Sequence, residues 1–189
     1  TYDHPAIFLI PEMDGVRVLT RESHEIVQKV PKCVFNIFGI GVTEASSFLF
    51  YSHKKFCERS HQADEYLSLI MDRIDVAVDE CIKAANYEFD TETQKSLIRA
   101  AHFGKGFIAN HKPDEYIRVC KILRVLNAVR VDEIGIPLTF AQFYHLTPAV
   151  LIDRLVFRKK YALAIQIAKH LNLSESRIME HWAYHKIMY

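Results

Sequence analysis

The sequence predicts a mainly α-helical protein, an α-solenoid of stacked antiparallel helical hairpins that two or three β-strands precede. After Pro31 the spacing of apolar residues changes from about two, typical of strands, to nearly four, typical of helices. Helix-start signals then recur along the rest of the chain. The connections, such as residues 86–90 and 172–174, are short, so consecutive helices should pack as antiparallel pairs.

The N-terminal residues have the pattern of a β-hairpin followed by a third strand. The apolar run 6–10 and the partly alternating run 16–20 flank a turn signal at residues 12–15. A further strand is expected at residues 25–30, because Pro31 has no N–H for a ladder and ends it.

These strands are too few to form an independent sheet, since two or three strands are marginally stable in water. We therefore expect residues 1–31 to complete a sheet whose other strands lie upstream of Thr1 in a longer protein. Residues 32–189 should form the helical part.

About eight helices are expected, each from a local signal. Thr43 should open a helix over residues 44–59. Two capping boxes, in which a Thr and a Gln three residues later satisfy the first N–H groups of a helix, are Thr91 with Gln94 and Thr139 with Gln142. Three further signals are Pro113 in a first helical turn, Gly135 in the left-handed position past a helix end, and Thr147 as an N-cap before Pro148.

Residues 115–134 predict an inner helix of the stack. Polar side chains recur there every third position, at Glu115, Arg118, Lys121, Arg124, Asn127 and Arg130. Because each residue turns a helix by about 100°, steps of three move this stripe around the helix, which then needs neighbours on several sides.

Residues 151–171 predict a helical hairpin with a basic elbow. Ala164 and Ala168 are four residues apart and share one helix face. Their small side chains should allow close approach to the preceding helix.

Composition indicates a folded chain from a reducing compartment. Half of the 189 residues are hydrophobic and a quarter are charged, and no apolar run approaches the roughly 20 residues that span a bilayer. The four cysteines, which form no Cys-x-x-Cys pair and lie far apart, are Cys33, Cys57, Cys81 and Cys120. This spacing argues against a disulfide framework or a zinc knuckle and favours a cytosolic setting.

Charge is distributed unevenly along the chain. Residues 1–95 carry 10 Lys and Arg against 16 Asp and Glu, whereas residues 96–171 carry 12 against 5. An acidic end and a basic middle can steer association with a charged partner over short distances.

His181 and His185 raise the alternative of a metal site. They are spaced i, i+4 and could share one helix face, as ligands of helical zinc sites do. The protease pattern needs Glu directly after the first His, but Glu180 precedes it, and a third ligand, such as His170, would have to come from a neighbouring helix. A structural or partner-facing role is the preferred interpretation, and no metal site is predicted.

No catalytic constellation or cofactor motif is recognised. Gly104, Lys105 and Gly106 lack the preceding strand and the spacing of a phosphate loop, so the glycines should loosen a helix end or admit another helix closely. The acidic residues Asp72, Asp75, Asp79 and Glu80 are spaced for a solvated helix face. No Gly-x-Ser-x-Gly elbow is present.

The candidate partner-facing residues are four basic side chains and the single tryptophan: Arg154, Arg158, Lys159, Lys160 and Trp182. The basic group could meet nucleic acid, anionic lipid or an acidic protein surface. No RNA-module signature accompanies it, so a protein interface or a solvated elbow is favoured. Trp182 fits either a core or an interface hot spot.

Long ordered strings across nearly the whole chain resemble the vacuolar protein sorting-associated protein 16 family. Near the N-terminus they are PEMDGVR at residues 11–17 and ADEYL at 63–67. The middle strings are QKSLIRAA at 94–101, FGK at 103–105, LRVLNAVR at 123–130 and IGIPLT at 134–139. The last are DRLV at 153–156, LAIQI at 163–167 and HWA at 181–183.

The resemblance implies an N-terminal β-propeller whose closing strands would be residues 1–31, followed by an α-solenoid that begins at residue 32. It implies a non-enzymatic scaffold subunit of the HOPS and CORVET tethers, which bridge late endosomal and lysosomal or vacuolar membranes and support SNARE-mediated fusion. The implied partners are other class C core subunits, including a Sec1/Munc18-type protein that the family holds through solenoid beyond Tyr189.

By the same resemblance, the protein would be cytoplasmic and peripheral on those membranes, with indirect membrane association, no nucleic acid and no cofactor. Two alternatives stay open: a scaffold of another vesicle coat or adaptor complex, and a helical metal-dependent enzyme that uses His181 and His185.

Overall fold

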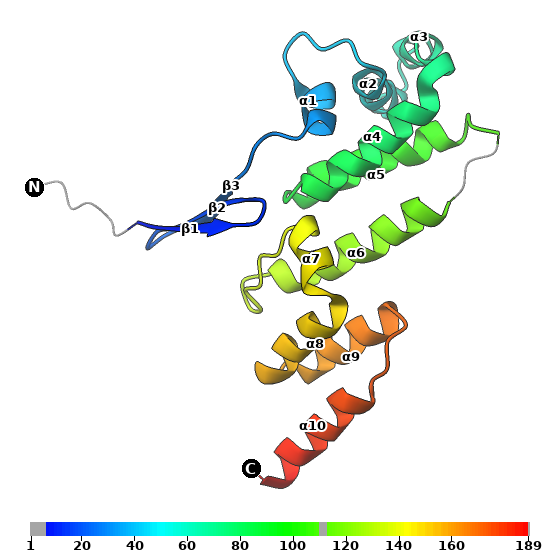
Figure 1. Ribbon diagram of the computed structural model, residues 1–189. Coiled ribbons are helices and arrows are strands. Elements are labelled where there is room, and N and C mark those ends of the chain that lie inside the picture. Colours follow the sequence, from blue (N-terminus) through cyan, green and yellow to red (C-terminus); the bar gives the residue numbers. More distant parts are fainter. Residues whose placement is uncertain (1–6, 110–112, 189) are drawn as a thin grey trace, which may run out of the picture. The chain divides into compact units, whose positions relative to one another are not determined.

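Ten α-helices follow a three-stranded antiparallel sheet within residues 7–109 and 113–188, which the computed structural model describes (Figure 1). The mainly α-helical class is confirmed, although eight helices were expected. The residues group into two compact units that divide at Lys112 and Pro113.

The first unit contains the strands β1 (Phe8–Glu12), β2 (Gly15–Leu19) and β3 (His24–Val27), the helices α1 (Lys32–Phe38), α2 (Ala45–Cys57), α3 (Gln62–Ser68), α4 (Ile74–Tyr87) and α5 (Thr91–Lys105), and the 3-10 turn η1 (Met71–Arg73). The second unit contains α6 (Asp114–Arg130), α7 (Phe140–Leu146), α8 (Pro148–Phe157), α9 (Tyr161–His170) and α10 (Ser176–Met188).

The sheet has the order β1-β2-β3 and confirms the predicted hairpin. A Cβ on Gly15 would lie 2.5 Å from the Val27 carbonyl oxygen, so only glycine allows β2 and β3 to approach here. The third strand is shorter than expected and ends at Val27 instead of residue 30.

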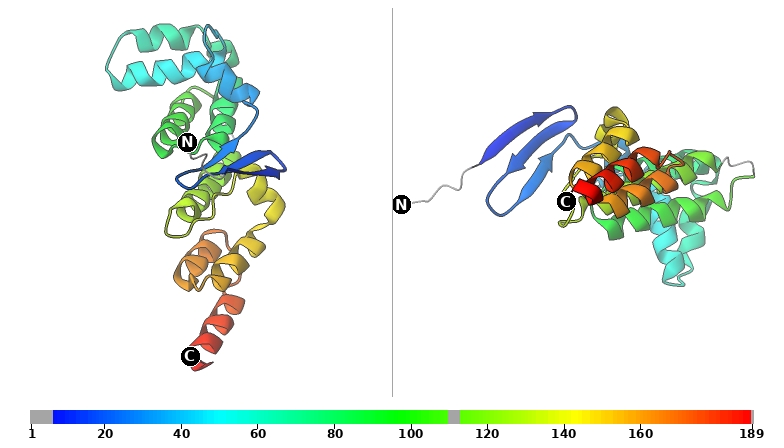
Figure 2. Two further views of the ribbon diagram at one scale, coloured as in Figure 1. Left: turned by 90° about the vertical axis from the view of Figure 1, so that its left-hand side faces the viewer. Right: turned by 90° about the horizontal axis from the view of Figure 1, so that it is seen from below.

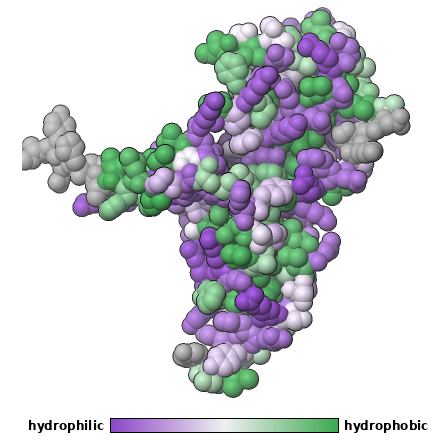
Figure 3. Space-filling model, in the orientation of Figure 1, coloured by the Kyte–Doolittle hydropathy of each residue, from purple (hydrophilic) through white to green (hydrophobic). Residues whose placement is uncertain are grey.

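One face of the sheet holds a polar cluster around the buried Arg17. Arg17 donates two hydrogen bonds to the Glu12 carboxylate, at 2.6 and 2.8 Å, and lies 3.0 Å from His24 Nε2. Burial and the Arg17 charge lower the pKa of His24. Phe8 and Leu9, neighbours on β1, are both exposed by about two thirds, and Figure 3 shows hydrophobic side chains along these strands.

The helical hairpin α4–α5 is the densest part of the first unit. A three-residue connection reverses the chain, and both views place the helices side by side (Figures 1 and 2). A Cβ on Gly104 of α5 would lie 2.6 Å from Val78 Cγ2 and 2.9 Å from Leu49 Cδ2. The expectation that glycine here admits neighbouring helices is confirmed, because α4 and α2 both approach Gly104.

Two predicted helix starts in this unit are wrong by one residue. Asp90, not Thr91, is the N-cap of α5, and its carboxylate accepts from the Thr93 N–H at 2.8 Å. A charged acceptor one residue before Thr91 thus satisfies a free backbone N–H of the first helical turn. Glu44, not Thr43, is the N-cap of α2, without a side-chain cap bond.

The solvated acidic face is also partly wrong, because Glu80 is half-buried. Its carboxylate accepts from Asn36 Nδ2 of α1 at 2.8 Å and from Ser46 Oγ of α2 at 2.6 Å. Glu80 therefore joins three helices, whereas Asp75 and Asp79 are exposed as expected.

In the second unit, the start of α7 is as predicted. Thr139 Oγ1 accepts from the Gln142 N–H at 3.1 Å, and Gln142 Oε1 accepts from the Thr139 N–H at 3.2 Å, which completes the capping box. Pro148 opens α8 after Thr147, although the Thr147 side chain makes no cap bond. Pro113 is the N-cap of α6 and does not enter its first turn.

A half-buried arginine fixes the loop from α6 to α7. Arg130 Nε donates to the Leu138 carbonyl at 3.0 Å, and burial lowers the pKa of Arg130 to about 10. Gly135 has the predicted left-handed conformation, with φ of 61°. The wide buried face of α6 comprises Val119, Ile122, Leu123, Val125, Leu126 and Val129.

The hairpin α8–α9 forms as predicted, with Ala164 and Ala168 fully buried. Figure 2 shows the two helices side by side, followed by α10. In α10, Ile178 alone is buried among the described residues.

Candidate partner-binding surface

The turn between α8 and α9 is a Schellman motif built from lysines. The Lys160 N–H donates to the Leu155 carbonyl and the Lys159 N–H donates to the Val156 carbonyl, both at 2.9 Å. Lys159 takes φ of 60°, the left-handed conformation that glycine usually supplies at this position.

The same arrangement ends two other helices. Arg59 after α2 and Asn172 after α9 have φ of 55° and 57°, and paired backbone bonds close each end. Left-handed backbone costs a side-chain-bearing residue about 1 kcal/mol relative to glycine. Lys159 therefore places a positive charge at this turn, where glycine would be less strained.

The four predicted basic residues have different surroundings. Arg158 donates from Nη1 to the carbonyl oxygens of Ile134 and Gly135, so it holds the loop between α6 and α7. The side chains of Arg154 and Lys160 are exposed and have no ion-pair partner in residues 7–109 and 113–188. These two are therefore open to an acidic group.

Trp182 lies next to this elbow, on α10. Its ring stacks on Tyr161, with centroids 5.9 Å apart and planes inclined by 18°. The Lys186 ammonium lies 5.1 Å from the Trp182 centroid, in cation–π geometry. Trp182 is half-buried, so one part packs against Tyr161 and the rest reaches the surface.

Phe157 completes the surface and is not among the residues that sequence reasoning singled out. It is 79% exposed at the end of α8, and its ring lies 6.3 Å from the His181 ring. An aromatic residue on each side of a basic run, as in Phe157 to Tyr161, is the signal that could have revealed it. We define the elbow surface as Arg154, Phe157, Lys159, Lys160, Trp182 and Lys186.

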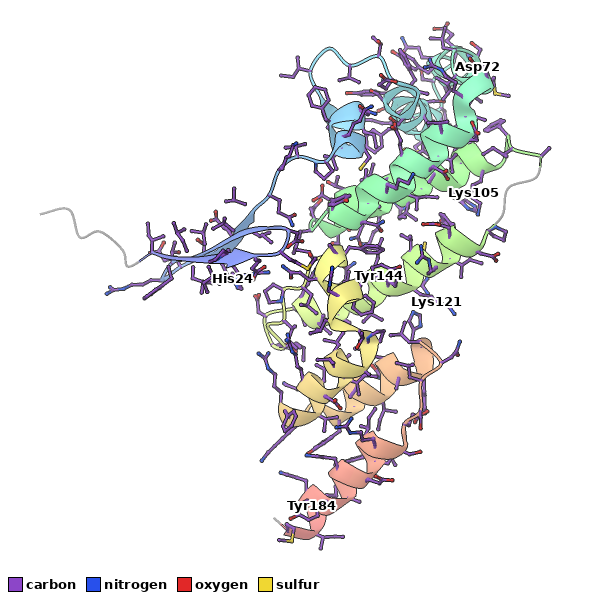
Figure 4. All side chains as sticks on the ribbon, in the orientation of Figure 1. His24, Asp72, Lys105, Lys121, Tyr144 and Tyr184 are labelled. Atoms are coloured by element: carbon purple, nitrogen blue, oxygen red, sulfur yellow. The ribbon has the colours of Figure 1, made fainter. Side chains whose placement is uncertain are left out.

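The elbow surface has the composition of an interface. Aromatic side chains supply apolar area at low entropic cost, and the cations beside them supply charge complementarity. The rest of α10 adds exposed apolar residues, including Tyr184, which Figure 4 labels, and Ile187.

His181 and His185 are engaged with an aromatic residue of α9. The Tyr161 hydroxyl lies 3.2 Å from His181 Nδ1, and the Tyr161 and His185 rings are 6.0 Å apart. His170 is at the opposite end of α9, nine residues away, or about 13 Å along the axis. It therefore does not join the other two histidines.

No group of three or more His, Cys, Asp or Glu side chains is placed to hold a metal ion in the part of the chain that the structure describes. Likewise, none of the described helices combines the length and the apolar character needed to cross a membrane.

Comparison with known proteins gives consistent matches. Residues 1–118 match the family model described as Vps16, N-terminal region. The chain is 62% identical to the vacuolar protein sorting-associated protein 16 homolog of Drosophila melanogaster, over 99% of this chain and 22% of that protein. It is 44% identical to the protein VACUOLELESS1 of Arabidopsis thaliana, over 98% and 22%.

A more distant relative is the vacuolar protein sorting-associated protein 16 of Saccharomyces cerevisiae, with 32% identity over 85% of this chain and 20% of that protein. The chain thus spans about a fifth of the length of these curated relatives.

Proposed function

Because the chain belongs to the Vps16 family, we propose that it is a segment of a scaffold subunit of the HOPS and CORVET membrane-tethering complexes. The observation that carries the proposal is the family match over 62% of the chain, residues 1–118 of 189, together with high identity to vacuolar protein sorting proteins. In this role the subunit supports SNARE-mediated fusion on the route from endosome to lysosome or vacuole.

The segment acts through surfaces, without catalysis. Its helices pack as hairpins, and the elbow surface offers exposed aromatic and basic side chains. Other class C core subunits are the partners that we assign to this surface. A Sec1/Munc18-type subunit belongs to the same assembly, and its contact lies outside these 189 residues.

The domain division follows the same proposal. Residues 1–31 are the closing strands of a β-propeller and residues 32–189 begin an α-solenoid. Exposed apolar residues on β1 support an incomplete sheet, because an isolated face of this kind normally packs against further strands. The protein is cytoplasmic and reaches late endosomal, lysosomal or vacuolar membranes as a peripheral member of its complex.

Co-purification of the full-length subunit tests the assignment. With Arg154→Glu, Lys160→Glu and Trp182→Ala together, we expect recovery of at least one class C core subunit to fall about tenfold, since loss of two charge contacts and an aromatic anchor exceeds 1.4 kcal/mol. Asp72→Asn and Asp79→Asn, both exposed on the first unit, form the control. If the unaltered subunit never recovers class C core partners, the assignment is wrong.

Two competing functions give different results in the same preparation. A scaffold of another coat or adaptor complex would co-elute with subunits of that complex instead. A metal-dependent enzyme would contain stoichiometric zinc that His185→Ala removes, as elemental analysis would show.

A further inference from the structure

The second unit has two apolar hollows that both include His170 in their lining. The first, of about 280 Å³, lies between α6, α7 and the end of α9 and is lined by Ile122, Phe143 and Pro148. The second, of about 300 Å³, is shallower and lies between α6 and α9, over Ala128. We call the two hollows together the α6–α9 groove.

Three cations spaced one turn apart on α6 line the groove. Arg118 donates to Glu115 at 3.0 Å and to the Tyr144 hydroxyl at 2.6 Å. Lys121 and Arg124 have no ion-pair partner in residues 7–109 and 113–188. Figure 4 labels Lys121 on α6 and Tyr144 on α7.

The cations that line the groove are not balanced by acids among the described residues of its lining, although Glu115 pairs with Arg118. No Asp or Glu of the described residues lines either hollow. Residues 113–189 contain 11 Lys and Arg against 7 Asp and Glu. A positive rim around apolar walls is complementary to a ligand that combines carboxylates with apolar side chains.

His170 supplies an independent indication of a ligand. Its Nε2 atom is enclosed and has no hydrogen-bond partner among the described residues. Such an atom costs about 1–3 kcal/mol when it stays unsatisfied, so buried polar atoms normally have a partner. Because Nε2 is enclosed in this structure, a small shift of the ring would bring it within reach of a carboxylate or peptide carbonyl in the groove, which could then accept its hydrogen bond.

We infer that the α6–α9 groove binds an acidic segment of a partner protein, with one or two apolar side chains in the hollows. Carboxylates of the segment pair with Lys121 and Arg124, and one polar group meets His170. The concave apolar walls favour a peptide over a flat membrane surface, and a phosphate backbone has no apolar side chains to fill them. The groove is separate from the elbow surface, so each proposal can fail alone.

The test uses the 189-residue chain and fluorescein-labelled 12-residue peptides in which pairs of Leu or Phe alternate with pairs of Asp or Glu. Matched peptides carry Asn and Gln in place of the acids. Fluorescence polarisation should show saturable binding of acidic peptides, at least tenfold tighter than that of the amide peptides.

Two groove variants and one control locate the binding. Lys121→Glu with Arg124→Glu should weaken acidic peptide binding at least tenfold, because attraction becomes repulsion at two positions. His170→Phe keeps an aromatic side chain but removes the ring nitrogens, and should weaken binding about fivefold. Lys160→Glu on the elbow should change it less than twofold. Circular dichroism checks that each variant is folded. If Lys121→Glu with Arg124→Glu unfolds, the neutral pair Lys121→Gln with Arg124→Gln replaces it.

The inference is wrong if no acidic peptide binds saturably, or if the amide peptides bind equally well. It is also wrong if both groove variants bind like the unaltered chain. The same conclusion applies if the charge variant loses binding to phosphatidylserine vesicles or single-stranded RNA while the peptides never bind.

Discussion

Helices α5 and α10 have similar lengths and opposite surroundings. α5 buries Leu97, Ala100, Ala101 and Gly104 between α4 and α2, whereas α10 buries Ile178 alone among its described residues. The small residues of α5 let neighbouring backbones approach closely, and the aromatic residues of α10 are left partly exposed. The comparison shows that α5 contributes mainly to packing in the first unit, whereas α10 leaves most of its surface exposed in the second.

Filling the closest contact of α5 should have the largest effect. Gly104→Leu places side-chain atoms where Val78 and Leu49 already lie, and we expect it to lower the free energy of unfolding by about 3 kcal/mol. Urea denaturation followed by circular dichroism measures the change. Gly106→Leu, whose Cβ would meet its nearest atom at 3.3 Å, is the matched control and should change stability by less than about 1 kcal/mol. Equal effects of the two substitutions would contradict the packing argument.

Removal of the carboxylate that joins α1, α2 and α4 should have the next largest effect. Glu80→Ala leaves Asn36 and Ser46 without their acceptor, and we expect a loss of about 2 kcal/mol in the free energy of unfolding. The exposed neighbour Asp79→Asn should change stability by less than about 0.5 kcal/mol. A Glu80→Ala protein as stable as the control would show that these hydrogen bonds add nothing.

Truncation of a buried side chain in α10 should destabilise that helix alone. Ile178→Ala removes the one described buried apolar side chain of α10, so this helix should open while the rest of the second unit stays folded. Hydrogen exchange within residues 176–188 should accelerate at least tenfold, with little change in α8. Cooperative loss of protection in α8 and α10 together would refute the distinction between the two helices.

The smallest effect is a pH dependence of the first unit. Burial and the Arg99 charge lower the pKa of His53, so the folded state disfavours its protonation. The unfolded chain takes up the proton first as pH falls below about 6.5, and stability should decrease from there until the folded pKa is passed. Thermal melts at pH 7.5 and pH 5.5 should show a smaller difference for His53→Gln than for the unaltered chain. Identical pH differences would exclude His53 as a contributor.

The sequence predicted the start of a helix well where one local interaction determines it. The Thr139 and Gln142 capping box needs no distant residue and forms as expected. The start of α5 differs because Asp90 offers a charged acceptor one residue before Thr91. Glu80 looked solvated because its partners on α1 and α2 are 44 and 34 residues away in sequence.

The candidate surface was only partly visible for the same reason. A run of basic residues can be read directly, so the elbow was predicted. The stacking of Tyr161 on Trp182, and the bond from Arg158 to the Ile134 carbonyl, depend on how separate helices meet. The enclosed nitrogen of His170 likewise has no sequence signature, because its surroundings come from α6, α7 and α9.

The Arg158 bond also has a mechanical consequence. The guanidinium links the elbow directly to the loop after α6, in parallel with the covalent path through α7 and α8. A force on the elbow is therefore carried by both the Arg158 hydrogen bonds and the covalent chain. Part of it does not pass through Thr147, the single residue between α7 and α8. This bracing should limit bending of the second unit at Thr147, where one residue joins α7 to α8.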